Sequence, residues 1–508
     1  MSRGITRRDF LQKGGVAVAA GLAAQKTAAN ALRSPTENRQ GARSKDMTEL
    51  RVELAEIDLP DFGRPTVEPE IEAAEYEARL RTLWDKAVER GLDVLLVYGD
   101  REHAANLAFL TGFGPMFEEA LLVLNGQGPP ILLVGNEGWG FSQVSPVKLD
   151  RRLYQPFSLM GEDRSKSKSL AAILEDARVR QGTKAGLVDW KYFGSEVGDS
   201  PELWLNAPAY LVQTLSQVAG RPPINVTDIL MNPRDGLRAL NSVDQLASFE
   251  FAATCGSNSM WRVMQSLRPG MSEFEAMEQA RLNGLRLSNH AVLCTGPRAA
   301  WVGTPSSRRM QRGEPCLLGI GVWGGNSARA GFLVRNGDEL PGPIRDYVER
   351  LVKPYFAAVV EWYQTIGVGV TGGELYEVIH RRLGDPFFGI SLNPGHLIHL
   401  DEWLHSPIYP GSNIKMQSGM AVQVDIIPAT GGPYFISYME DGLALADEPL
   451  RQAFARRWPE AWARIQARRA FMQDKLGIKL KPEVLPFSNL AAFLPPYLLN
   501  PRMAMRVA

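Results

Sequence analysis

The chain has 508 residues, of which 45% are hydrophobic and 22% are charged, a balance that is typical of globular proteins and excludes disordered or collagen-like chains. Its 56 basic and 56 acidic residues cancel, so no net positive charge would attract a phosphate backbone, and we expect no nucleic-acid partner. No apolar run reaches the roughly 20 residues that cross a membrane, so we also expect no membrane span.

Residues 1–31 have the pattern of a cleavable export signal. Arg7 and Arg8 precede a short apolar stretch rich in Gly and Ala, and the segment ends in Ala-Asn-Ala. The run Thr-Arg-Arg-Asp-Phe-Leu around the two arginines resembles the twin-arginine motif, which directs folded proteins across a membrane. We therefore expect the protein to be exported by the twin-arginine route and to be periplasmic or secreted.

A polar leader at 32–69 precedes a predicted α/β domain at 70–234. The spacing of apolar residues over 76–91 predicts a helix, and the continuous apolar run over 93–98 predicts a buried strand. Helices that alternate with strands in this way indicate the α/β class. Further strands are predicted at 120–124, 131–134 and 184–190.

A turn-rich segment then leads into a second domain, predicted over 235–476. This domain opens with a long helix over 243–267, and two later helices begin with the Ser/Thr-x-x-Glu pattern of a capping box, at Ser272 and Thr371. The tail at 477–508 is apolar and interrupted by prolines. We expect the tail to pack on its own domain or on a partner subunit, because such a surface is rarely left in water.

The segment from Gly319 to Gly324 fits the G-x-G-x-x-G pattern of dinucleotide-binding proteins. In that motif the glycines open a helix, whereas here the residues over 328–334 have the composition of a strand. We therefore predict a hairpin with its turn at 324–326. The alternative is a dinucleotide-binding site, and the strand-like composition after the glycines argues against it.

Several motifs in the second half of the chain resemble, in their order and spacing, those of the creatinase/aminopeptidase superfamily. They are Cys-Thr-Gly-Pro-Arg at 294–298, Gly-Thr-Pro-Ser-Ser-Arg at 303–308, Gly-His at 395–396 and Glu-Asp-Gly at 440–442. This superfamily includes methionine aminopeptidase, prolidase, Xaa-Pro aminopeptidase and creatinase. The resemblance implies an α/β (α+β) fold in which a creatinase-like N-terminal domain is followed by a pita-bread domain.

The superfamily holds two divalent cations with two Asp, one His and two Glu, and the resemblance places these five positions in this chain. Gly319 and Ala330 occupy the two Asp positions, and the other three are occupied by His396, Asp425 and Glu440. The resemblance therefore implies at most one divalent metal ion, Mn, Zn or Fe, held by the last three residues. The alternative, a hydrogen-bonded polar cluster without metal, remains open.

The histidines that transfer protons in the superfamily are also replaced in this chain, by Val302 and Trp403. His399 and His405 lie close in sequence to His396, and imidazole is the side chain best suited to proton transfer near pH 7. These two residues are therefore candidate catalytic residues, with a structural role as the alternative. The other histidines are interpreted as structural: His103, His290 and His380.

Two functions remain open from the sequence. The first is an exported hydrolase, similar to Xaa-Pro peptidases or creatinase, that acts on a carbon–nitrogen bond with at most one metal ion. The second is a catalytically inactive protein that binds a small molecule or a peptide in the same cleft. In either case the resemblance implies a homodimer.

Overall fold

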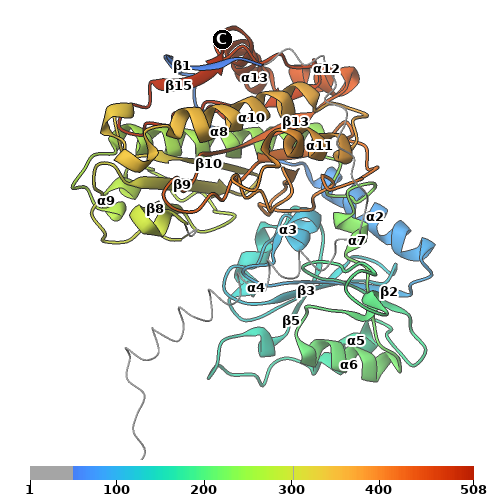
Figure 1. Ribbon diagram of the computed structural model, residues 1–508. Coiled ribbons are helices and arrows are strands. Elements are labelled where there is room, and N and C mark those ends of the chain that lie inside the picture. Colours follow the sequence, from blue (N-terminus) through green and yellow to red (C-terminus); the bar gives the residue numbers. More distant parts are fainter. Residues whose placement is uncertain (1–49, 301–302) are drawn as a thin grey trace, which may run out of the picture. The chain divides into compact units, whose positions relative to one another are not determined.

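The computed structural model describes residues 50–300 and 303–508. Within these ranges the strands form three sheets, of six, seven and two strands (Figure 1). The mixture of helices and sheets confirms the predicted α/β (α+β) class. No helix of the described ranges is long and apolar enough to cross a membrane. The predicted export signal at 1–31, the first part of the predicted leader and Val302 lie outside the described residues.

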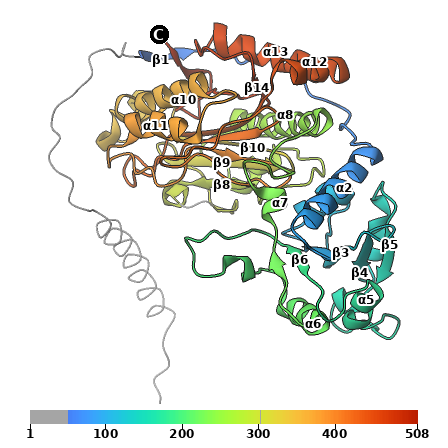
Figure 2. The same cartoon turned by 90° about the vertical axis from the view of Figure 1, so that its right-hand side faces the viewer.

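The six-stranded sheet has the strand order β5-β4-β3-β2-β6-β7 and is covered by helices on both faces (Figures 1 and 2). Because both faces are covered, β2 and β3 are buried along their whole length, which explains their continuous apolar runs. The predicted strands at 93–98, 120–124, 131–134 and 184–190 are thereby confirmed, with ends that differ by up to two residues. The strands are β2 (Val94–Gly99), β3 (Ala120–Leu124), β4 (Ile131–Val134), β5 (Asp150–Leu153), β6 (Ala185–Val188) and β7 (Ile224–Asn225).

Apart from β3 and β4, which follow each other directly, the helices of this region alternate with its strands along the chain. Leu80 and Leu83 of α2 and Leu107 of α3 join the apolar core on one side of the sheet. Leu174 of α5 and Leu215 of α6 belong to the core on the other side. The helices are α2 (Ala73–Glu89), α3 (Ala105–Thr111), α4 (Gly138–Phe141), α5 (Leu170–Asp176), α6 (Ala209–Ala219) and α7 (Asp228–Met231).

The seven-stranded sheet has the order β11-β12-β13-β10-β9-β8, and β14 pairs with β13 outside this path. All of its paired strands are antiparallel. The strands are β8 (Val292–Thr295), β9 (Pro315–Val322), β10 (Gly325–Phe332), β11 (His396–Leu397), β12 (Ala421–Asp425), β13 (Tyr438–Leu445) and β14 (Val484–Pro486). The helices that follow or precede them are α8 (Val243–Ser266), α9 (Glu273–Glu278), α10 (Lys353–Thr365), α11 (Gly372–Leu383), α12 (Glu448–Arg457) and α13 (Pro459–Asp474).

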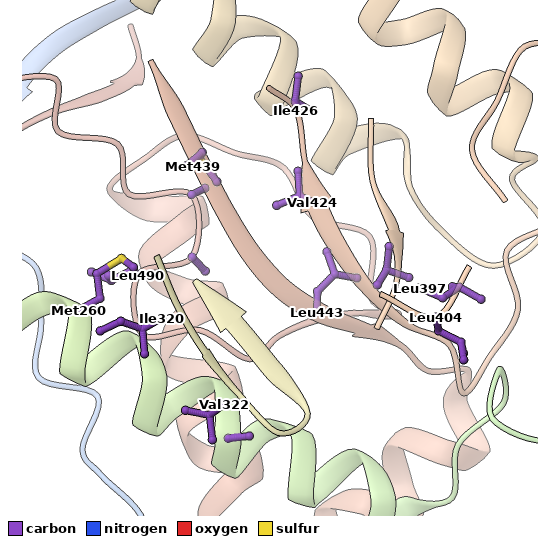
Figure 3. Close-up of a cluster of buried hydrophobic side chains, with 14 of the residues drawn as sticks. Met260, Ile320, Val322, Leu397, Leu404, Val424, Ile426, Met439, Leu443 and Leu490 are labelled. Atoms are coloured by element: carbon purple, nitrogen blue, oxygen red, sulfur yellow. The ribbon is translucent and has the colours of Figure 1, made fainter. Parts of the chain in front are cut away.

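Alternation along these strands gives the seven-stranded sheet two different faces. Figure 3 shows the apolar face, where Met260 of α8 lies beside Ile320 of β9, and Val424 of β12 and Met439 of β13 point into the same core. Successive residues of a strand point to opposite faces. The neighbours of Val424 and Met439 in sequence, Asp425 and Glu440, therefore belong to the other face of the sheet.

The predicted hairpin is confirmed, with its turn one residue earlier than expected. β9 and β10 are antiparallel neighbours joined by Trp323 and Gly324, and Gly325 is already part of β10. Gly324 has a φ of +98°, a conformation that favours glycine, and a Cβ atom at Gly325 would lie 2.5 Å from the backbone nitrogen of Ala253. Gly324 thus permits the tight turn, and Gly325 permits the close packing of the hairpin on α8.

Both predicted capping boxes are present, at the starts of α9 and α11. The tail packs on its own chain: β14 joins the large sheet, and β15 (Met503–Val507) pairs with β1 (Val52–Glu56), blue beside red in Figure 1. Leu490, Phe493 and Leu494 of the tail are buried. The apolar character of the tail is therefore accounted for within one chain.

Candidate metal centre

His396, Asp425 and Glu440 converge on the polar face of the seven-stranded sheet. They lie on the neighbouring strands β11, β12 and β13, and each offers a ligand-type atom within 4.8 Å of the others. His396 Nε2 is 3.8 Å from Asp425 Oδ2 and 3.9 Å from Glu440 Oε1. Asp425 and Glu440 are direct cross-strand partners. The structure thus brings together the three residues that the sequence selected.

The imidazole of His396 is oriented as a ligand. Burial lowers the pKa of His396 to about 4, so the ring is neutral at pH 7. Its Nδ1 atom lies 3.2 Å from the carbonyl oxygen of Leu397, which accepts the ring proton and leaves a lone pair on Nε2. The distances from Nε2 to the two carboxylates are too long for hydrogen bonds. A neutral nitrogen lone pair facing two carboxylates is the arrangement found around a bound cation.

Among the described residues, no Lys or Arg forms an ion pair with either of the two carboxyl groups, Asp425 and Glu440. Burial, and then the nearby charge of Glu402, raise the pKa of Asp425 to about 7. Burial and the charges of Asp425 and Glu402 raise the pKa of Glu440 well above its usual range. Asp425 Oδ1 is buried and has no hydrogen-bond partner among the described residues. This donor set of one nitrogen and several carboxylate oxygens fits a divalent cation such as Mn(II), Zn(II) or Fe(II).

Glu440 is held by two hydrogen-bond donors from the same face of the sheet. The hydroxyl of Tyr438 donates to Glu440 Oε2, and Asn326 Nδ2 donates to Glu440 Oε1 over 3.0 Å. Both donors are buried. They fix the orientation of the carboxylate in the way that outer contacts fix the ligands of metal sites.

A pocket of about 280 Å³ opens onto Asp425 and Glu440. One side of this pocket is acidic and polar, with Glu402 and Asn326 beside the two carboxylates. The other side is apolar. It is lined by Val292, Leu317, Leu318, Ile427 and Ile436, and it includes Gly319 and Ala328, which carry no polar side chain.

The register of the strands places Ala328, and not Ala330, in line with Gly319 and Glu440. Gly319 is opposite Ala328, which is opposite Glu440, which in turn is opposite Asp425, so these four residues form one row across four strands. Ala330 pairs instead with Leu317 and Tyr438, and it lies farther along the strand. The assignment of Ala330 to the second Asp position of the superfamily stays a prediction.

His399 does not lie with the metal set. Its side chain is fully buried between the rings of Phe109 and Phe249, at centroid distances of 5.2 and 4.9 Å, and Arg238 Nε donates to its Nδ1 over 3.4 Å. Burial and then the charge of Arg238 lower the pKa of His399 well below its usual value. His399 is absent from the lining of the pocket, so its position gives no support to the predicted catalytic role.

His405 lies on the segment that returns beside β11, where it forms an isolated bridge with Leu397. Its ring stacks between Tyr192 and Trp403, with centroid distances of 5.9 and 6.1 Å. Burial lowers the pKa of His405. His405 is also absent from the pocket lining, and its acid–base role stays a prediction.

Several polar residues that line the pocket were not selected as site residues from the sequence. His290, interpreted as structural, is exposed there, and Glu402, Asn289 and Asn326 form a hydrogen-bonded group beside Glu440. Their signal in the sequence is weak. Asn326 follows the glycines of the hairpin, and Glu402 lies in the stretch that also contains His399 and His405.

Comparison with known proteins supports the fold. Residues 248–447 match the profile of metallopeptidase family M24, and no curated protein matches the chain in sequence. The prolidase from Pyrococcus horikoshii OT3 is 14% identical, with a TM-score of 0.56 over 73% of this chain and 95% of that chain. Dipeptidase PepE from Mycobacterium ulcerans is 18% identical, with a TM-score of 0.56 over 76% of this chain and 95% of that chain. X-Pro aminopeptidase from Thermotoga maritima MSB8 is 15% identical, with a TM-score of 0.55 over 73% of this chain and 95% of that chain.

At these identities the likeness concerns the fold. The match to prolidase structures and to family M24 confirms the predicted pita-bread fold of the second half of the chain.

Proposed function

We propose that the protein is a hydrolase of carbon–nitrogen bonds that uses one divalent cation held by His396, Asp425 and Glu440. The observation that carries this proposal is the convergence of three ligand atoms within 4.8 Å of one another beside a pocket. The match of residues 248–447 to family M24 supports it, as does the likeness to proteins described as prolidase, dipeptidase and X-Pro aminopeptidase.

The row of residues across the sheet favours one cation over two. Asp425 and Glu440 supply carboxylates at one end of this row, whereas Ala328 and Gly319 supply no donor side chain at the other. The three atoms nearest to a Cβ atom at Gly319 would all be carbon atoms, two of Val292, the nearer at 3.4 Å, and one of Ala328 at 3.9 Å. That end of the row is therefore apolar and gives a second cation no ligand.

A divalent cation bound at this site would supply Lewis acidity, which polarises a carbonyl group and makes bound water more acidic. The residues of the chain would orient the ligands and bind the substrate. Tyr438 and Asn326 keep the Glu440 carboxylate in one orientation, and the apolar wall accepts the apolar part of a substrate and excludes water from it. The size of the pocket suits a small peptide-like amide and not a folded protein.

The experiment is metal analysis and a hydrolysis assay on the purified full-length chain. We expect about one Mn(II), Zn(II) or Fe(II) per chain and cleavage of small amides, with both lost in His396→Ala. His380→Ala is the matched control, since His380 stacks on Tyr376 of the same helix, α11, and is not part of the site. Turnover that survives His396→Ala would contradict the proposal. Tight ligand binding without turnover would favour the catalytically inactive alternative.

We also propose export by the twin-arginine route and a homodimer. Export is supported by the signal-like pattern of residues 1–31, and a reporter fused to this segment should reach the periplasm only in cells with a working twin-arginine system. The dimer is supported by the resemblance alone, because the apolar tail is buried within its own chain. Light scattering should give about twice the mass of the chain, and a mass that stays that of a single chain at all concentrations would overturn the dimer.

A further inference from the structure

Glu402 is an acidic residue of the pocket that comes from outside the strands. It lies in the loop after β11 and lines the same pocket as Asp425 and Glu440. Two amide groups hold it in place. Asn326 Nδ2 donates to Glu402 Oε1 over 2.9 Å, and Asn289 Nδ2 donates to Glu402 Oε2. Both carboxylate oxygens of Glu402 are therefore positioned.

The amide of Asn326 connects Glu402 to the metal set. Its nitrogen donates both to Glu402 Oε1 over 2.9 Å and to Glu440 Oε1 over 3.0 Å, so the two carboxylates lie on either side of one amide nitrogen. Asn326 is on β10, two residues before Ala328, and thus on the same face of the sheet. Glu402 is therefore hydrogen-bonded to β10, the strand whose residue in the row across the sheet is Ala328 and not a carboxylate.

The surroundings of Glu402 are rich in unpaired oxygen atoms. Asn326 is 4% exposed, and its Oδ1 atom has no hydrogen-bond partner among the described residues. Asp425 Oδ1 and Asn289 Oδ1 also have no hydrogen-bond partner among the described residues. All three residues line the pocket. Among the described residues, no Lys or Arg forms an ion pair with Glu402, Asp425 or Glu440. Buried oxygen donors without a compensating positive charge are what a hard or borderline cation requires.

We propose that Glu402 is a fourth protein ligand of the divalent cation, supplied by the loop after β11 in place of the carboxylates that Gly319 and Ala328 do not provide. This inference rests on the proposed function, because it assumes that His396, Asp425 and Glu440 bind a cation. It adds a residue to the site, and it gives the loop a role in metal affinity.

The test is titration of the full-length chain with Mn(II) and with Zn(II), followed by calorimetry. Glu402→Gln removes the charge and keeps the shape, and we expect it to weaken binding by at least about tenfold with the stoichiometry unchanged. Asp401→Asn is the matched control: it removes the same charge from the next residue, whose carboxylate pairs with Arg238 over 2.7 Å outside the pocket. Its affinity should stay within about twofold of the wild type.

The outcomes separate this inference from the proposed function. If His396→Ala abolishes binding and Glu402→Gln leaves it unchanged, Glu402 is not a ligand and the proposed function stands. If Asp401→Asn weakens binding as much as Glu402→Gln, a disturbed loop explains both results and the inference fails. If the wild type binds neither ion, both proposals fail. Circular dichroism of each variant checks folding. Should Glu402→Gln not fold, Glu402→Asp replaces it, with a weaker binding constant expected and an unchanged one counting against the inference.

Replacing the bound ion by Co(II) gives a readout that a purely structural role of Glu402 would not change. The visible absorption of Co(II) depends on its ligands, so the spectrum of Glu402→Gln should differ from that of the wild type. An identical spectrum at saturating Co(II) would mean that Glu402 does not contact the ion.

Discussion

Arg329 and Asp441 form a fully buried ion pair, with 2.8 Å between Nη2 and Oδ2, on the face of the sheet opposite Glu440. Arg329 also donates to the carbonyl oxygen of Phe493 in the tail over 2.7 Å. The pair therefore ties β10, β13 and the tail together directly behind the candidate site.

Replacing Arg329 with Met should destabilise the protein strongly. The change leaves the Asp441 carboxylate buried without its partner, and breaking one side of a buried pair typically costs about 3–5 kcal/mol. Chemical denaturation should show this loss as a lower midpoint. The double variant Arg329→Met with Asp441→Leu is the control, and we expect it to recover part of the stability because no unpaired charge remains.

Carboxylates placed in the row across the sheet should create a second cation site. The double variant Gly319→Asp with Ala328→Asp puts both new side chains opposite the existing set, and calorimetry should then show about two Mn(II) ions per chain. Gly319→Asp with Ala330→Asp carries the same charge one strand pair away and should show no such increase. Equal stoichiometry in the two variants would contradict the register argument.

Cleavage of Xaa-Pro dipeptides by the wild type is expected to be negligible, even with added Mn(II). Ala328 and Gly319 offer no ligands for a second cation, and the candidate proton carriers His399 and His405 do not line the pocket. A prolidase assayed in parallel provides the reference rate. A wild-type rate close to that reference would show that one cation suffices.

Stability at acidic pH should depend on Glu250. Burial alone would raise the pKa of Glu250, but Arg468 and Arg464 outweigh it and lower the pKa below its usual value. Because the pKa is lower in the folded state, the stabilisation is present above the unfolded-state pKa and is lost as the pH falls through the folded-state pKa. Thermal melting of the wild type and of Glu250→Gln should therefore differ at neutral pH and converge in acid. A difference that does not change with pH would exclude this linkage.

Local patterns in the sequence predicted much of the fold. The apolar runs of β2 and β3 identify strands covered on both faces, and the capping boxes at Ser272 and Thr371 identify the starts of two helices. These features depend on residues that are neighbours in sequence. The resemblance, and not local pattern, selected His396, Asp425 and Glu440.

The remaining features of the site depend on tertiary packing, which sequence spacing does not record. The strand β11 contains only two residues, after which the chain turns, so that His399 enters the core beside Phe109 although it lies three residues from His396. Glu402 reaches the pocket because side chains from β10 and from the segment before β8 hold it. The strand register places Ala328, and not Ala330, opposite Glu440, and residue spacing alone does not give this register.

The pairing of β1 with β15 has a consequence for biosynthesis. Glu53 and Arg506, whose ion pair joins the two strands, are 453 residues apart in sequence. The ribosome therefore releases β1 long before its partner exists, and the open edge of β1 stays available to other strands during that interval. Contacts between such distant residues form late and slow the folding of a domain. Closure of this small sheet is thus expected to be among the final events in the maturation of the protein, after β15 has left the ribosome.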